Sequence, residues 1–260
     1  MRASPCSPLP ALAALLGLVS GARAEIIGMD TFDVPDGPAH ARVSGAFWDF
    51  HRHRGHQGEP APWCGMSGDP EFRGGRLLTP APSKALRTFA HTPLEGRSPG
   101  YGHNKPGQVY DGILENKGSL FVRARVEATA AGTGVGVHFY DWNSERVYVG
   151  ILRGEDSPRQ WGVELGKSDG NGAKPEEMGA FPSGLTLAPG RAVSLICQVD
   201  WSTRAIHLWL DPAPGPRPAP SFSRPYSARN WITAVAFSAF GEGAASWDEI
   251  AVATRWEDLP

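Results

Sequence analysis

Short runs in which apolar and polar residues alternate are the dominant pattern of this chain, and no long helical pattern accompanies them. In residues 120–128 the even positions are apolar, while Arg123, Arg125 and Glu127 occupy odd positions. A period of two is typical of a β-strand with one buried face. Comparable runs predict further strands at residues 135–139, 147–151, 161–165, 193–199, 206–210, 234–240 and 247–254.

Turn-forming residues separate these runs. Asp200, Ser202 and Thr203 lie between two strongly patterned runs and predict a tight hairpin. Residues 35–107 are less regular, with Gly and Pro spread between expected strands at 46–50 and 85–91. The whole pattern predicts an all-β fold with antiparallel neighbours. No boundary divides residues 25–260, so we expect one domain there.

Aromatic residues and histidines occupy the opposite face of several predicted strands. If Val137, Val149 and Leu208 face the core, the alternate positions face away from it. Those positions hold Tyr140, His138, Tyr148, Trp209 and His207, and Trp142 lies in an adjoining turn. Such a face suits a sugar, because aromatic rings stack on a pyranose while polar edges bind its hydroxyls. The alternative is that this second face is also buried, as a further core layer.

The first 24 residues have the pattern of a signal peptide. A short basic start is followed by an apolar run at residues 9–19 and by Ala22 and Ala24, the small residues that signal peptidase requires. The run is shorter than a membrane span needs. We therefore expect cleavage near Glu25 and a secreted protein, extracellular or periplasmic, without a remaining membrane span.

Charge and composition exclude several partners. The chain holds 25 basic and 27 acidic residues, and removal of residues 1–24 takes away Arg2 and Arg23, which leaves 23 basic residues. The remaining basic residues are scattered rather than clustered, so nothing predicts nucleic-acid binding. No basic amphipathic helix predicts docking on a membrane surface.

Two cysteines, Cys64 and Cys197, remain after the expected cleavage. An oxidising compartment permits them to pair, but two cysteines do not make a disulfide framework. Cys197 lies on the apolar face of a predicted strand and Cys64 in a predicted loop rich in Gly and Pro. The sequence leaves their pairing open, since it does not give their separation.

An ordered set of motifs resembles a known superfamily. The motifs are the segment 32–37 (Phe-Asp-Val-Pro-Asp-Gly), the segment 209–212 (Trp-Leu-Asp-Pro), and Trp247 to Ile250 followed by Thr254 to Trp256. With them the chain resembles the concanavalin A-like lectin/glucanase superfamily, and within it the laminin-G-like jelly-roll proteins that bacteria secrete. The resemblance implies a jelly-roll β-sandwich of two packed antiparallel sheets. Its motifs are structural, so they bear on fold more than on function.

The resemblance also implies a structural calcium ion where the first and last strands meet. The matching acidic position is Asp248, and Asp30 and Asp33 are candidates for further oxygen ligands. Independently of the resemblance, His51, His53 and His56 have a spacing that suits zinc or copper, although neighbouring arginines oppose a cation. Asp169 and Asn171 form a smaller candidate calcium loop.

Recognisable catalytic motifs are missing from the sequence. The glucanases of this superfamily use Glu-x-Asp-x-Glu on a strand, and no Glu in this chain has an Asp two positions later. No Gly-x-Ser-x-Gly motif is present either. We therefore expect a non-catalytic module that binds a polysaccharide or a cell-envelope glycan. A polysaccharide-active hydrolase or lyase with a carboxylate pair formed by the fold, and a structural or adhesion protein that binds another protein, remain as alternatives.

Overall fold

Most of the alternating runs form strands in the computed structural model, which describes residues 26–41, 63–88, 118–141, 144–154, 159–166, 174–228, 232 and 234–260. Several expectations lie outside the described residues: the signal peptide, the strand at 46–50, the histidines at 51, 53 and 56, Trp142 and the 169–171 loop. Among the described residues, no helix is long and apolar enough to cross a membrane.

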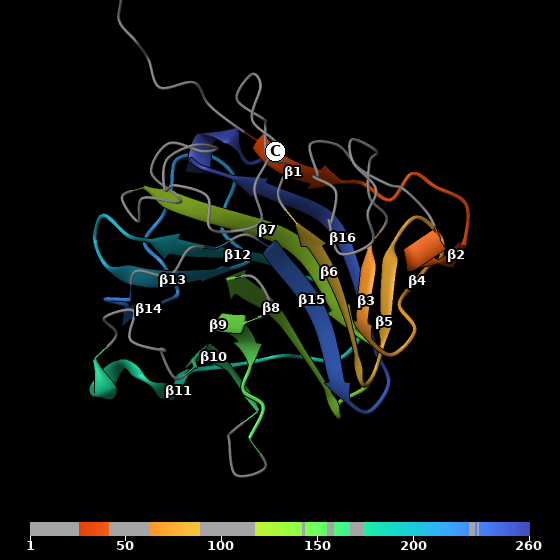
Figure 1. The fold of residues 1–260 in the computed structure, drawn as a ribbon, viewed down its shortest axis with the longest axis horizontal. Helices are drawn as coiled ribbons and strands as arrows, with labels where there is room; N and C mark the ends of the chain where they lie inside the picture. The colour runs from red at the N-terminus through yellow and green to blue at the C-terminus, as the bar shows by residue number, and fades with distance from the viewer. Residues whose placement is uncertain are drawn as a thin grey trace, which may run out of the picture.

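One sheet runs across the whole molecule in Figure 1, from β13 and β14 on the left to β4 and β2 on the right. Nine strands of the described residues form it: eight follow one another across the sheet, and the ninth, β1, pairs with β16. In spatial order they are β14 (Phe222–Pro225), β13 (Ala205–Leu210), β12 (Val193–Asp200), β7 (Ser119–Ala128), β16 (Ala244–Ala253), β5 (Leu77–Pro80), β4 (Glu71–Phe72) and β2 (Gly37–Pro38), with β1 (Ile26–Asp30) beside β16.

The second sheet has seven strands in the part of the chain that the structure describes, and every strand pairing in both sheets is antiparallel. Its order is β11 (Gly179–Thr186), β10 (Gln160–Leu165), β9 (Ser144–Ile151), β8 (Thr133–Asp141), β15 (Ala234–Gly241), β6 (Ser83–Thr88) and β3 (Cys64–Ser67). Short 3-10 helices occur at η1 (Ala39–Ala41), η3 (Pro175–Glu177) and η4 (Trp256–Asp258).

The apolar face of each sheet is buried against the other in one continuous core. Val122 and Trp247 come from the nine-stranded sheet and Val137 and Phe237 from the seven-stranded sheet, and all four are at most 1% exposed. The rings of Phe237 and Trp247 lie edge to face across the core, 5.2 Å apart. The predicted β-sandwich of two antiparallel sheets is therefore confirmed.

The hairpin predicted at residues 200–203 joins β12 to β13. Asp200 accepts hydrogen bonds from the backbone amides of Ser202 and Thr203 at 2.9 and 3.1 Å. This local capping explains why the chain reverses direction at this point. Figure 1 shows the two strands side by side at the left of the molecule.

Cys64 belongs to β3 rather than to a loop, so that prediction was wrong. Cys197 is a free thiol buried in the core, on β12 of the opposite sheet. Burial raises the pKa of the Cys197 thiol, which makes it a poor nucleophile in the native state. A packed core, not a Cys64–Cys197 disulfide, holds the sandwich together.

Candidate functional site

The aromatic residues predicted to form one sugar-binding face lie on two different sheets. Tyr148, Tyr140 and His138 belong to β9 and β8, whereas Trp209 and His207 belong to β13. Alternation placed all of them correctly on faces directed away from the core between the sheets. The order of strands within a sheet cannot be read from alternation, and the prediction of a shared platform was therefore wrong.

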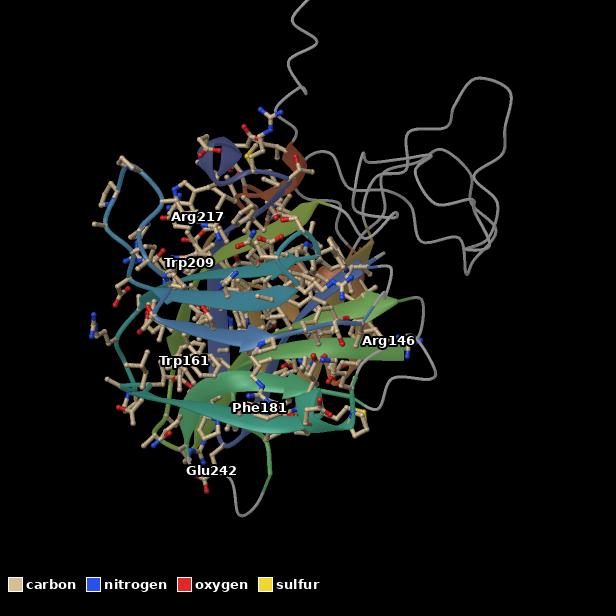
Figure 2. All side chains as sticks on the ribbon, turned by 90° about the vertical axis from the view of Figure 1, so that its left-hand side faces the viewer. Arg146, Trp161, Phe181, Trp209, Arg217 and Glu242 are labelled. Atoms are coloured by element: carbon tan, nitrogen blue, oxygen red, sulfur yellow. The ribbon has the colours of Figure 1, made fainter. Side chains whose placement is uncertain are left out.

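Trp209 is covered by other side chains of the nine-stranded sheet and the C-terminal segment. It is 1% exposed, its indole N–H donates to the carbonyl of Pro218 at 3.0 Å, and the ring of Trp256 lies 5.2 Å away. Arg217 lies over the Trp209 ring at 4.9 Å, and Figure 2 shows the two residues close together. His207 is half-buried and hydrogen-bonds Ser223 at 2.8 Å. This face is a second packed layer, as the alternative expectation had it.

Tyr148 is likewise fully buried, under the polar side chains of the seven-stranded sheet. Its hydroxyl donates to the carbonyls of Ile151 and Val135 at 2.6 and 3.1 Å, so the ring lies along the sheet. Arg153 stacks on it with the guanidinium carbon 4.1 Å from the ring centre. Tyr148 forms the floor of a polar site and is not an exposed stacking platform.

A β-bulge brings a carboxylate into that site. In the β8–β9 pairing, Phe139 lies opposite Val147, but Tyr140 lies opposite Glu145, so Arg146 is the extra residue of the bulge. Without the bulge, Glu145 would share the core-facing side of Val147, because side chains alternate along a strand. The bulge turns Glu145 to the outer face, beside Tyr140.

Arg153 joins two carboxylates above Tyr148. Its Nη2 donates to Glu145 at 2.6 Å and its Nε donates to Glu164 at 2.7 Å. The side chains of Arg153, Glu145 and Glu164 are 34%, 23% and 16% exposed, so solvent reaches all three. Since the guanidinium is planar, two such bonds hold both carboxylates in a fixed geometry.

Lys84 of β6 closes the opposite side of the site. Its ammonium donates to the Tyr140 hydroxyl at 2.8 Å and to Glu145 at 3.3 Å. The side chain is 21% exposed. Glu145 thus lies between two cations, Lys84 and Arg153, and the cluster as a whole is nearly neutral.

His138 lies at the bottom of the site between two partners. Its Nδ1 is 2.6 Å from Glu145 Oε2, and its Nε2 is 2.6 Å from the Ser238 hydroxyl. Burial lowers the pKa of His138 to about 4, and the hydrogen bond to Glu145 opposes that effect only in part. The imidazole is therefore neutral at physiological pH.

The charges of the cluster are fixed by their mutual contacts. Burial raises the pKa of Glu145, but its bonds to His138 and Arg153 outweigh this and hold the pKa well below the usual range. Burial lowers the pKa of Arg153, but Glu145 and Glu164 raise it above its usual value. Burial and the nearby Glu145 raise the pKa of Tyr140, which stays a phenol. The site thus presents a permanent carboxylate, a permanent guanidinium and neutral hydroxyls.

Several residues of this site escaped sequence reasoning. Lys84, Arg153 and Ser238 were not singled out, and Glu145 and Glu164 were not recognised as partners. The available signal was the mixture of polar and aromatic residues on the outward positions of residues 138–148. The bulge hid Glu145, because its spacing from Val147 assigns it to the core.

The proposed calcium ligands do not come together. Asp30 is fully buried, and its two carboxylate oxygens accept from the Phe32 amide and the Trp63 indole, both at 2.8 Å. Asp248 lies on the outer side of β16, 3.7 Å from Arg76. Asp33 is exposed. Within the described ranges no three His, Cys, Asp or Glu side chains cluster, so Asp30, Asp33 and Asp248 do not form one site together.

Comparisons with known proteins give structural neighbours only. No family model and no curated protein matches the chain. An uncharacterized protein from Mycobacterium paratuberculosis is 12% identical with a TM-score of 0.49, covering 86% of this chain and 98% of that one. The exoplasmic/lumenal domain of VIP36, bound to Ca2+ and Man2, is 8% identical with a TM-score of 0.48, covering 78% of this chain and 86% of that one.

A sialidase is also similar, at 10% identity and a TM-score of 0.43 over 75% of this chain. The chain spans only 17% of that sialidase, and 30% of a sialidase from Trypanosoma rangeli. All of these TM-scores lie below 0.5. The functional interpretation therefore rests on the chain's own residues.

Proposed function

We propose that this chain is an exported saccharide-binding β-sandwich and that its binding face is the outer face of β6, β8, β9 and β10. The observation that carries the proposal is the guanidinium of Arg153, fixed between Glu145 and Glu164 above the buried ring of Tyr148. The pattern of residues 1–24 supports export.

Rigid, partly exposed polar groups are what recognition of a sugar requires. A saccharide presents hydroxyls that both donate and accept, so a carboxylate beside a guanidinium can satisfy one hydroxyl twice. Among the described residues, Arg153 forms its side-chain hydrogen bonds through Nε and Nη2. Its Nη1 donors are therefore available to a ligand. Because the side chains are already ordered by each other, binding loses little of their conformational freedom.

Hydrolysis of a glycosidic bond by the Glu145–Glu164 pair is less well supported. Such a pair needs one carboxyl group that is protonated and acts as the general acid. Glu145 is held ionised by His138 and Arg153, and both carboxylates are tied to the same guanidinium. This geometry favours recognition over cleavage by two carboxylates.

A polysaccharide panel in native affinity gels, followed by calorimetry with oligosaccharides, tests the proposal. Arg153→Gln is expected to weaken binding at least about tenfold, since it removes a charged donor from the centre of the site. Arg123→Gln is the matched control, because Arg123 pairs with Glu249 at 3.0 Å on the other sheet. Equal affinity of wild type and Arg153→Gln for every saccharide bound would refute this placement of the site.

A further inference from the structure

Ser238, His138 and Glu145 form a continuous hydrogen-bonded line across three adjacent strands, β15, β8 and β9. Ser238 Oγ is 2.6 Å from His138 Nε2, and His138 Nδ1 is 2.6 Å from Glu145 Oε2. A serine beside an imidazole that a carboxylate orients is the arrangement of nucleophile, base and orienting group in serine hydrolases. Such a line is recognised by its geometry, whatever the order of its residues in the chain.

Hydrogen-bond logic fixes the direction of the protons along this line. Glu145 is ionised and can only accept, so the proton of the neutral imidazole is on Nδ1. His138 Nε2 then holds a lone pair, and the Ser238 hydroxyl donates to it. This is the tautomer in which a histidine can take a proton from serine.

A lysine lies opposite the nucleophile on the neighbouring strand. Lys84 is directly opposite Ser238 in the β6–β15 pairing, so their β-carbons are about 4.5–5.5 Å apart on the same face. Its ammonium is placed by Tyr140 and Glu145. A fixed positive charge on the same face as the serine can stabilise an oxyanion that forms on an attacked carbonyl group.

We infer that Ser238, His138 and Glu145 form a nucleophilic centre that hydrolyses small O-acyl esters, such as O-acetyl groups, on saccharides bound at the same face. The saccharide part of the inference rests on the proposed function, whereas the ester chemistry rests on the line of side chains alone. Ser238 is 4% exposed, so only a small group can reach its hydroxyl. An acetyl group carried on a sugar meets that requirement.

The reaction balances with water as the only co-reactant. Ser238 Oγ forms a bond to the ester carbon while its proton passes to His138 Nε2, and the carbonyl electrons form an oxyanion on the face that carries Lys84. The bond from carbon to the sugar oxygen then breaks, and that oxygen takes the proton from His138. Water repeats the sequence on the acyl-serine, which releases the carboxylic acid and restores Ser238.

The opposite sheet supplies a natural control. Ser223 and His207 are also hydrogen-bonded, at 2.8 Å, but through His207 Nδ1. In the described part of the chain no carboxylate hydrogen-bonds His207. The Ser223–His207 pair therefore contains a serine and a histidine, as the line does, but lacks a carboxylate that orients the imidazole.

Two measurements on the full chain test the inference: mapping of the serine labelled by a fluorophosphonate, and acetate release from acetylated xylo-oligosaccharides. We expect a label on Ser238 and acetate release that falls at least about 100-fold in Ser238→Ala and in Glu145→Gln. Ser223→Ala should retain both signals. Native circular dichroism of Ser238→Ala, a substitution that removes one oxygen, identifies loss caused by misfolding.

The outcomes separate this inference from the proposed function. Neither label nor acetate release, with saccharide binding intact, would overturn the inference and leave recognition standing. A label on Ser238 and release of acetate from p-nitrophenyl acetate, without binding of any saccharide, would support the ester chemistry and refute the saccharide substrate. A label on Ser223 in place of Ser238 would overturn the assignment of the nucleophile.

Discussion

The ring of Tyr148 occupies the space in which Gly136 would carry a β-carbon, on the neighbouring strand. A β-carbon on Gly150 would likewise lie only 2.5 Å from the Tyr148 hydroxyl oxygen. These two glycines let a large ring lie along the sheet, where it supports Arg153 from below. The absence of a side chain at these two positions of β8 and β9 therefore makes room for the Tyr148 ring, which is the floor of the site.

Gly136→Ala should consequently displace Tyr148 and lower the free energy of unfolding by about 1–3 kcal/mol, as overpacking does. Urea denaturation measures the loss. The same substitution in a Tyr148→Ala background should be much less destabilising, because the ring that it meets is gone. Equal losses in the two backgrounds would mean that the substitution acts through the backbone of β8 instead.

Glu145→Gln is expected to destabilise the protein more than Glu164→Gln. Glu145 accepts hydrogen bonds from His138, Arg153 and Lys84 at once. The loss of its carboxylate leaves a buried donor unsatisfied, which should lower the free energy of unfolding by about 1–3 kcal/mol. Glu164 accepts hydrogen bonds from the backbone amide and the Nε of Arg153 near the surface. Glu164→Gln should therefore lower the free energy of unfolding by only about 0–1 kcal/mol. Equilibrium unfolding of both variants at pH 7 makes the comparison, and the reverse order would contradict the central position of Glu145.

Acid should destabilise the fold through His138. The pKa of His138 is about 4 in the folded state and about 6.5 in the unfolded state, so the unfolded chain binds the extra proton between those values. Stability is therefore full above pH 6.5 and falls by about 3 kcal/mol as the pH drops to 4. Glu145, whose pKa is lowered, adds a further loss below pH 4.5.

Unfolding curves recorded between pH 7.5 and 4 test this expectation. The charged groups around His138 are Glu145, Lys84 and Arg153, and the lowered pKa of Glu145 and the raised pKa of Arg153 keep these two ionised through this window. His207, with a pKa that burial also lowers, acts in the same direction. The slope of the unfolding free energy against pH should therefore be smaller, but not zero, in His138→Gln. An unchanged slope in that variant would assign the effect elsewhere.

Arg217→Ala should expose Trp209 and destabilise the outer layer of the nine-stranded sheet. The guanidinium covers the rings of both Trp209 and Phe121 and donates to Gln198, so we expect a loss of about 1–2 kcal/mol. Arg73→Ala is the control, since the Arg73 side chain is 67% exposed. Similar unfolding midpoints for the two variants would show that the contacts of Arg217 with Trp209 and Phe121 do not stabilise the fold.

The strands that could be predicted are those in which apolar residues facing the core alternate with other residue types on the outer face. The alternation in residues 120–128 and 193–199 led directly to β7 and β12. β11 could not be found in this way, because it is an exposed edge strand that contains Pro182 and two glycines. Period-two alternation reports burial, and an edge strand exposed on both faces does not carry it.

The site was harder to predict than the fold because it depends on contacts between strands. Lys84 and Ser238 meet only through the pairing of β6 with β15, which are separated by most of the chain. The outward direction of Tyr148 and Trp209 was predicted correctly, and their burial agrees with the alternative of a second core layer. Arg153 and Arg217, which cover them, come from irregular segments that follow the strands, and no periodicity places such residues.

The bulge at position 146 makes the site tolerant of one change in chain length. Deleting Arg146 would make Glu145 the direct neighbour of Val147, and regular alternation would still direct Glu145 outward, opposite Tyr140. Homologues that share the site can accordingly differ by one residue between Tyr140 and Val147, provided that the acidic residue stays opposite the tyrosine. A one-residue gap in an alignment at this point would then mark the loss of the bulge and not the loss of the polar cluster.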